Sequence, residues 1–310
     1  MTVLFASSRP LGRAENIKAV YNAYGGSKAF TQLMPYRSSV DIRADYYDLL
    51  VTDEYPAESN AKVLMINHGG TGIKTFGRCM ENPYITDKDS RLITCATTSS
   101  KHMIDIVAKE CGIDQSRVFP TGLPRTDAYY NKQKGDGFTF LSGKRAYLYV
   151  PTWRRPDEVQ MPKIDWQFID NNLSDDEVLV VKPHMLSEHV LNREYKHITE
   201  LFSDVCSTPY LIDCDVVITD YSSIMFDAMV LNKPLILFDK SVGYLDTRGT
   251  YFKYPDKYSS WFCTDEVSLL ELMRSANEPD EVALACRDFT MGACDGHSTQ
   301  RVIELIRSML

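Results

Sequence analysis

The chain has 310 residues, 44% of them hydrophobic and 25% charged, which is typical of a globular protein large enough for two domains. Its net charge of -8 argues against the basic surface that nucleic-acid-binding domains usually present, so no nucleic acid is expected as a partner. A local basic pocket for a phosphate group is compatible with this charge.

The sequence gives no sign of a membrane span. No stretch approaches the roughly 20 apolar residues that a spanning helix needs. The opening segment MTVLFASSRP has no basic region before its apolar run, unlike a signal peptide. The 8 cysteines contain no CxxC pair, which favours reduced thiols. We therefore expect a cytoplasmic protein with at most peripheral contact at the inner membrane face.

Short β-rich runs alternate with helical patterns along the chain. In chain order, the patterns predict strands over residues 3–7, 47–52, 63–67, 91–97, 145–150, 177–182, 209–211, 216–219 and 234–238. They predict helices over residues 14–24, 99–111, 166–171, 223–231, 266–274 and 301–310. Ser99 or Ser100 is placed to cap the second helix, and Gly112 is a stop signal just past its end.

Apolar strands that alternate with helices indicate parallel sheets covered on both faces. The polar segment 131–143 is typical of a linker between two such halves. The predicted fold class is therefore α/β, with two Rossmann-like domains whose parallel sheets face each other across a cleft. We place the domains at residues 1–135 and 136–310, with the last helix free to pack back on the N-terminal domain.

The strongest candidate site lies where a buried strand ends at Thr219 and runs through Asp220 directly into a helix. Ser222 and Ser223 then stand at the helix N-terminus, where unpaired backbone N–H groups and the helix dipole favour a phosphate. The plain alternative is that Asp220 or Ser222 only caps the helix.

Two more clusters follow predicted strands in the same half of the chain. In PTWRRP, Thr152 and Arg154 offer a hydroxyl and a planar donor fork that suit an anionic ligand. The alternative there is a solvated loop with Trp153 in the core. In VVKPH, Lys182 and His184 place a cation and an imidazole where a pyrophosphate can rest, although a lone histidine at a strand end is more often structural.

A fourth cluster, NHGGTGIKTFG, places His68 at the start of a glycine-rich turn after a strand. Histidine is the natural general base near neutral pH, and Lys74 would favour an incoming phosphate. The glycine spacing fits neither the Rossmann fingerprint nor the P-loop. Of the other histidines, His189 and His197 are expected on the surface, and His102 is expected to pack or to be solvated.

Taken in order, these clusters resemble the CDP-glycerol glycerophosphotransferase family, which includes the teichoic-acid and capsule primases and polymerases. The matching stretches are HGGTGIK, TGLPRTD, LYVPTWR, VKPH, VVITDYSSIMFD, the YLDTRGTYF region and DGHSTQRV. They extend over roughly residues 66–302. The ITDYSS…FD element with PTWR upstream is the most specific pair.

The resemblance implies a GT-B-like fold with the donor bound by the C-terminal domain. It implies transfer of glycerol phosphate, or a related polyol phosphate, from a CDP-alcohol to an acceptor hydroxyl, with release of CMP and without a metal or other cofactor. The acceptor would be a glycan, a polyol phosphate or a lipid-linked primer. His68 matches the family's general base, and His184 matches the histidine that steadies the donor phosphates.

The remaining site residues also follow from the resemblance. The expected donor-binding residues are Thr152, Arg154, Lys182, Thr219, Asp220, Ser222, Ser223 and Arg248. Further candidates are Lys74, Arg125, Asp127 and Asp227. No metal ligand is expected.

The sequence departs from the family pattern in two loops and leaves other functions open. Gly69 and Gly70 add one residue to the turn after His68, and KYPDKYSSWF replaces a Pro-Gly-Pro-like stretch. Another GT-B enzyme, a nucleotide-sugar glycosyltransferase or an epimerase, would share the fold and the phosphate site. A non-enzymatic nucleotide-binding protein is a third possibility, against which the two histidines His68 and His184 argue.

Overall fold

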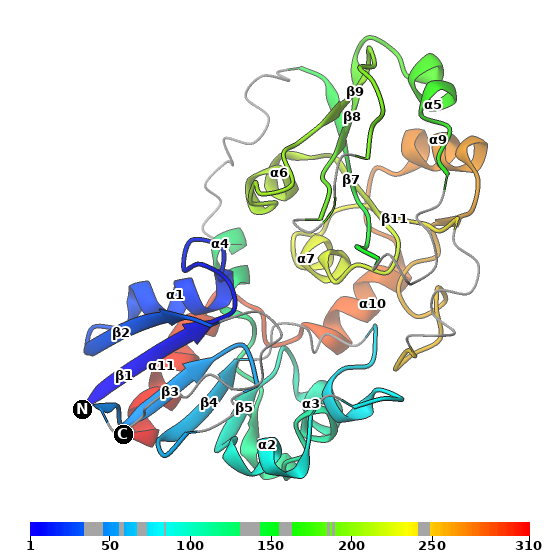
Figure 1. Cartoon of the computed structure of the whole chain (residues 1–310). Helices are drawn as coiled ribbons and strands as arrows, with labels where there is room; N and C mark the ends of the chain where they lie inside the picture. Colours follow the sequence, from blue (N-terminus) through cyan, green and yellow to red (C-terminus); the bar gives the residue numbers. More distant parts are fainter. Residues whose placement is uncertain are drawn as a thin grey trace. The chain divides into compact units, whose positions relative to one another are not determined.

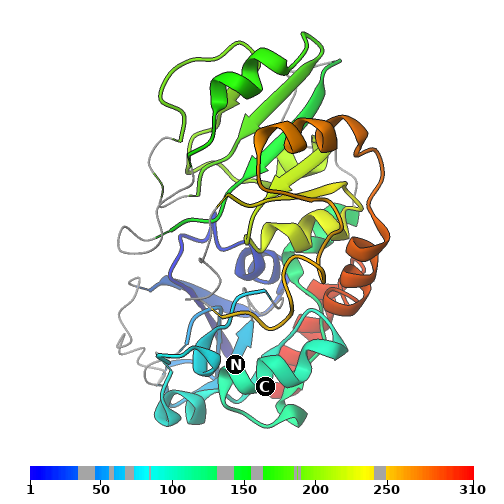
Figure 2. The same cartoon turned by 90° about the vertical axis from the view of Figure 1, so that its right-hand side faces the viewer.

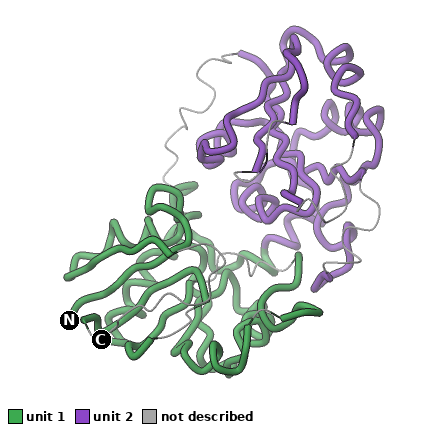
Figure 3. Tube along the Cα trace, in the orientation of Figure 1, with its two compact units in different colours: residues 1–132, 288–310 green, residues 133–287 purple. Residues whose placement is uncertain are grey.

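The computed structural model of the chain describes residues 1–33, 46–55, 59–66, 73–83, 85–130, 143–154, 163–184, 187, 190–240 and 249–310. The chain divides into two compact units (Figure 3): unit 1 is residues 1–132 with 288–310, and unit 2 is residues 133–287. The boundary expected between residues 135 and 136 lies outside the described residues. Within the described part of the chain, no helix is both long and apolar enough to cross a membrane.

Unit 1 is built on a parallel sheet of six strands in the order β2-β1-β3-β4-β5-β6 (Figure 1). Its strands are β1 (Thr2–Ser7), β2 (Ser27–Gln32), β3 (Leu49–Thr52), β4 (Lys62–Ile66), β5 (Cys95–Thr97) and β6 (Val118–Phe119). Its helices are α1 (Glu15–Ala23), α2 (Asp87–Leu92), α3 (Ile104–Cys111), α4 (Asp127–Tyr130) and α11 (Ser298–Met309). Helix α10 (Glu281–Thr290) contains the division between the units.

The two faces of this sheet carry separate apolar clusters because side chains alternate along each strand. Phe5, Val51 and Ile66 pack on one face with residues of α1 and α11. Met65 and Ala96 pack on the other face with residues of α3. The sheet is therefore covered on both sides, as its nearly continuous apolar strands predict.

Helix α11 is the last element described, and it belongs to unit 1 although unit 2 separates it in the sequence from the rest of that unit. Val302, Ile306 and Met309 recur at helical spacing and are buried against the sheet. Each such side chain stabilises the packed helix by roughly 1.5–3 kcal/mol. The first and last residues of the chain consequently lie near one another in both views (Figure 1, Figure 2).

Unit 2 is built on a second parallel sheet of six strands, in the order β12-β11-β10-β7-β8-β9. Its strands are β7 (Arg145–Val150), β8 (Glu177–Val181), β9 (Ile198–Glu200), β10 (Val216–Thr219), β11 (Leu235–Phe238) and β12 (Phe262–Cys263). Its helices are α5 (Trp166–Asn172), α6 (Thr208–Asp213), α7 (Ile224–Val230) and α9 (Glu266–Ser275). The central strands β10, β7 and β8 are buried along nearly their whole length.

The structure corrects two of the predicted strands. Residues 209–211 belong to helix α6, because Pro209 stands in the first turn of a helix, where its missing N–H is not needed. Arg91 belongs to helix α2, whose capping box is formed by Thr86 and Asp89. Both segments are short apolar runs, for which strand and helix patterns overlap. Gly112 ends α3 in the left-handed conformation, as predicted.

A substitution at Gly122 tests how closely the backbone segments of unit 1 approach one another. Its φ is +82°, and a Cβ atom there would lie 2.3 Å from the Ala293 carbonyl oxygen. We expect Gly122→Ala to lower the free energy of unfolding by about 3 kcal/mol, since it adds backbone strain to a steric clash. This loss corresponds to a fall of roughly 6–12 °C in the thermal midpoint.

Gly143→Ala is the matched control. Gly143 has a φ of +86° but open space around its missing Cβ. Strain alone then costs about 1 kcal/mol. Equal midpoints for the two variants, measured by circular dichroism, would contradict the packing argument.

Candidate functional site

The central strands of unit 2 bring three of the predicted clusters to one edge of the sheet. Strands β10, β7 and β8 are parallel neighbours, and their register pairs Thr219 with Val150 and Tyr149 with Val181. The residues that follow these strands, including Asp220, therefore emerge side by side at the carboxyl edge, where ligands of open parallel sheets bind.

Asp220 joins two of these strand ends. Its Oδ1 accepts a hydrogen bond of 2.8 Å from the backbone N–H of Thr152, and its Oδ2 lies 3.0 Å from Nη2 of Arg154. The side chains of Arg154 and Asp220 are only 2% and 4% exposed. A buried ion pair is maintained only with good geometry and further hydrogen bonds, so this contact fixes the loop after β7 against the loop after β10.

The two threonines at this edge behave differently. The Thr219 hydroxyl donates to the Val150 carbonyl oxygen at 2.6 Å, so it ties β10 to β7. The Thr152 hydroxyl is buried and makes no hydrogen bond within the described part of the chain. Most buried polar atoms in folded proteins are hydrogen-bonded. The Thr152 hydroxyl is therefore an exception at this edge, and its predicted role in donor binding stays a prediction.

Aromatic side chains follow the same strands and contact one another. Trp153 stacks on His184, with 5.9 Å between ring centroids and 25° between planes. The Tyr221 hydroxyl donates to Asp239, the Tyr221 ring lies 4.8 Å from that of Tyr254, and the Tyr254 hydroxyl approaches the Asp220 carbonyl oxygen at 3.4 Å. Burial, reinforced by the charge of Asp220, raises the pKa of Tyr254 well above its usual value. This phenol therefore stays protonated.

Tyr221, Asp239 and Tyr254 were not predicted as site residues from the sequence. Tyr221 lies inside the DYSS element and Asp239 directly follows β11, so position at a strand end is the signal that points to both. Tyr254 lies in KYPDKYSSWF, the stretch that departs from the family pattern, so the resemblance gave it no role. Only the fold brings it to the edge.

Lys182 and the two serines also lie at this edge. Lys182 is 6% exposed, and its ammonium donates to the carbonyl oxygens of Pro183 and Ser203 at 2.7 and 3.0 Å. Ser222 and Ser223 are partly exposed and immediately precede α7. Asp227 is 2% exposed within α7. Roles of these residues in donor binding stay predictions.

Several predicted site residues lie elsewhere. His68, Arg248 and His189 lie outside the described residues, and Lys74 is a partly buried residue of unit 1. The prediction that His197 lies on the surface is wrong, since the residue is only 6% exposed. Its backbone N–H donates to Asp170 at 2.7 Å, and this hydrogen bond holds His197 just before β9.

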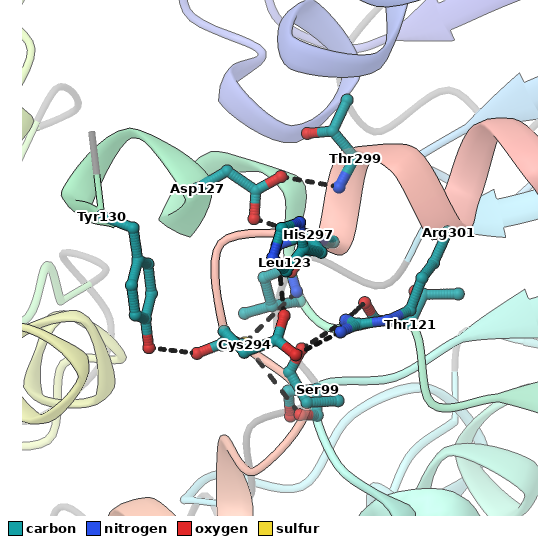
Figure 4. Close-up of polar contacts among 12 residues, drawn as sticks. Ser99, Thr121, Leu123, Asp127, Tyr130, Cys294, His297, Thr299 and Arg301 are labelled. Carbon is teal, nitrogen blue, oxygen red and sulfur yellow. Dashed lines mark hydrogen bonds and ion pairs between the residues drawn. The ribbon is translucent and has the colours of Figure 1, made fainter.

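The TGLPRTD and DGHSTQRV segments meet in unit 1 (Figure 4). The Asp127 carboxylate accepts hydrogen bonds from the backbone N–H groups of Ser298 and Thr299 at 3.0 and 2.7 Å, so it caps the start of α11. Arg301 donates to the Thr121 and Ala293 carbonyl oxygens at 2.9 and 2.8 Å. These contacts anchor the C-terminal segment.

Arg125 belongs to the same region. Its backbone N–H donates to Oδ1 of Asn16 at 2.9 Å, which connects the TGLPRTD segment to α1. His102, the other histidine considered for packing, stacks on Phe289 with 4.9 Å between centroids. In the described residues, no group of three or more His, Cys, Asp and Glu side chains is arranged to hold a metal ion.

Comparison with known proteins gives a family match over nearly the whole chain. The family described as CDP-glycerol:poly(glycerophosphate) glycerophosphotransferase matches residues 16–308. The teichoic acid glycerol-phosphate primase of Bacillus subtilis (strain 168) is 26% identical over 310 residues, which cover 95% of this chain and 77% of the primase. The teichoic acid poly(ribitol-phosphate) polymerase of Bacillus spizizenii is 26% identical, and the match covers 84% of this chain and 45% of the polymerase.

Solved structures confirm the fold. The wall teichoic acid polymerase TagF superposes with a TM-score of 0.78 at 21% identity, covering 99% of this chain and 88% of that chain. The UDP-GlcNAc 2-epimerase of Methanocaldococcus jannaschii superposes with a TM-score of 0.59 at 11% identity and similar coverage, 99% and 100%. The predicted two-domain, Rossmann-like and GT-B-like architecture is therefore confirmed.

The ion pair at the carboxyl edge of unit 2 leads to a testable stability difference. We expect Asp220→Asn to lower the free energy of unfolding by about 3 kcal/mol, because the buried Arg154 charge loses its counter-charge. The control is Asp175→Asn, in the exposed pair of Asp175 with Lys196, whose side chains are 83% and 69% exposed. It should leave stability unchanged in urea titrations. Equal losses in the two variants would contradict the assignment.

Proposed function

The chain belongs to the CDP-glycerol:poly(glycerophosphate) glycerophosphotransferase family, and on that premise we propose that it transfers glycerol phosphate from CDP-glycerol to an acceptor hydroxyl and releases CMP. The observation that carries the proposal is the meeting of the PTWR, VKPH and DYSS segments at one carboxyl edge of the unit 2 sheet. These are the segments expected to hold the donor.

The donor diphosphate would bind at this edge. The Thr152 hydroxyl supplies a donor that none of the described residues uses. Ser222 and Ser223 are partly exposed and follow β10, the strand that pairs with β7. Lys182 supplies positive charge close to its strand end. Because Asp220 holds the Thr152 backbone, these donors are positioned before the ligand arrives, which is the arrangement that stabilises charge on phosphoryl oxygens.

The chemical step is an in-line displacement. The acceptor oxygen attacks the phosphorus that carries glycerol, a new P–O bond forms, and the bond to CMP breaks. His68 follows β4 by two residues and is proposed to take the proton from the acceptor hydroxyl. His184, held by its stack on Trp153, is proposed to steady the phosphate oxygens as charge moves to CMP.

The proposal extends to the partners of the reaction. The acceptor is proposed to be a polyol phosphate, glycan or lipid-linked primer, since the relatives are a teichoic acid primase and polymerases. The chain spans about half the length of the polymerases. The number of glycerol phosphate units that it adds to one acceptor is therefore measured in the test below. The proposed mechanism uses no metal or other cofactor, and transfer is proposed to occur in the cytoplasm.

Incubation with CDP-alcohols tests the function directly. We expect purified protein with CDP-glycerol and an oligo(glycerol phosphate) acceptor to release CMP in proportion to acceptor lengthened, with EDTA present. Chromatography of the nucleotides separates CMP from UDP. Release of UDP from UDP-sugars, with none of CMP from CDP-glycerol or CDP-ribitol, would replace the proposal with a sugar-nucleotide enzyme.

The role of His68 gives a second test. We expect His68→Asn to lower kcat by a factor of roughly 10²–10⁴, the usual contribution of a general base, while the donor Kd from calorimetry stays within twofold. His102→Asn is the control, since His102 is an exposed histidine of the same unit. Loss of donor binding in His68→Asn would remove His68 from the role of base.

A further inference from the structure

The carboxyl edge of the unit 1 sheet carries hydroxyl and carboxylate side chains that the proposed reaction has not used. They follow strands β1, β3 and β5, and we call them the polar row: Ser7, Ser8, Asp53, Glu54, Thr97 and Thr98. Strands β3 and β5 flank β4, which leads in sequence to His68. The row therefore belongs to the strands on either side of the one that His68 follows in the sequence.

The register places half of the row at one level. Ile66 of β4 pairs with Thr97 of β5. β1 pairs Ala6 with Thr52 of β3, and β3 pairs Thr52 with Met65 of β4, so Ser7, Asp53 and Ile66 each follow a paired residue by one position. Four adjacent parallel strands, about 4.8 Å apart, thus carry Ser7, Asp53, Ile66 and Thr97 in line.

Alternation along the strands assigns these side chains to one face. Phe5 and Val51 pack on the face that α1 and α11 cover, so Ser7 and Asp53, two residues on, point to that face as well. A hydrogen bond of 3.1 Å from the Ser7 hydroxyl to Oδ2 of Asp53 agrees with this.

The other half of the row comes one residue later along the chain. The Ser8 hydroxyl donates to Oε1 of Glu54 at 2.5 Å. Thr98 directly follows Thr97, the last residue of β5. Each half of the row therefore contains hydroxyls and a carboxylate.

The threonines of the row have unused hydrogen-bonding capacity. Thr97 and Thr98 are 0% and 1% exposed, and neither hydroxyl has a hydrogen-bond partner among the residues that the structure describes. A buried hydroxyl without a partner loses its hydrogen bonds to water at a cost in stability. Two such groups at neighbouring positions of a ligand-binding edge point to a ligand that supplies the missing bonds.

The chemistry of the row selects the class of ligand. Hydroxyls and carboxylates donate to and accept from neutral hydroxyl groups, whereas Asp53 and Glu54 repel a phosphate. We infer that the polar row binds the hydroxyl groups of the terminal polyol of the acceptor. This inference rests on the proposed function and adds the acceptor-binding residues to it.

Thr97→Val is the main test because it removes one unpartnered hydroxyl and little volume. With di(glycerol phosphate) as acceptor, we expect kcat/KM for the acceptor to fall roughly tenfold, mainly through KM. The donor Kd should not change, and the thermal midpoint should stay equal or rise, since an unsatisfied hydroxyl is lost. Thr126→Val is the control: the Thr126 hydroxyl donates to the Leu123 carbonyl oxygen at 2.7 Å, so this change should lower the midpoint and leave KM alone.

A probe without one hydroxyl completes the test. An acceptor that ends in propane-1,3-diol phosphate should react roughly tenfold less well with the wild type, but Thr97→Val should lose little or nothing further, because the two deletions remove the same contact. Should Thr97→Val fold poorly, Asp53→Asn takes its place with the same expected interaction.

The possible outcomes separate the two proposals. Full additivity of the two deletions, or unchanged acceptor KM in an active Thr97→Val variant, overturns the polar row and leaves the transferase intact. If the wild type releases no CMP from any CDP-alcohol, the proposed function fails and the acceptor role of the row fails with it.

Discussion

The buried contact of Arg154 with Asp220 is the constraint on which the unit 2 site depends. Loops that follow neighbouring parallel strands share no ladder hydrogen bonds, so nothing in the sheet itself fixes one loop against the other. The carboxylate of Asp220 supplies that connection by accepting from Arg154 and from the Thr152 backbone. Both side chains are almost wholly buried, and the low local dielectric strengthens their interaction. The backbone of Thr152 is thereby held in place, while its hydroxyl has no partner among the described residues.

Much of this arrangement could be predicted from the sequence. Apolar runs such as Val216–Thr219 alternate with helical patterns, and parallel strands that emerge at one edge must bring their following residues together. Hence Asp220, Thr152 and His184 could be assigned to one region before any coordinates were known. The end of helix α3 at Gly112 could be predicted for a different reason. Glycine adopts the left-handed conformation that ends a helix, and this depends on local chemistry alone.

Other features depend on contacts between distant segments, and no local pattern reports them. Asp127 looked like a candidate for substrate chemistry, yet it caps a helix that begins 171 residues later. His197 has the sequence context of a surface residue but is buried by the docking of its strand. At Pro209, the short apolar run fits both a strand pattern and a helix pattern. Contacts with the rest of the fold decide that it forms a helix.

The return of α11 to unit 1 has a consequence for how the chain acquires its structure. Unit 1 lacks part of its core, including Val302 and Ile306, until residues 288–310 join it. During synthesis from the N-terminus, all of unit 2 leaves the ribosome before those residues do. The second unit can therefore complete its fold while the first still exposes an apolar face, and the N-terminal half of the protein is the last to be finished.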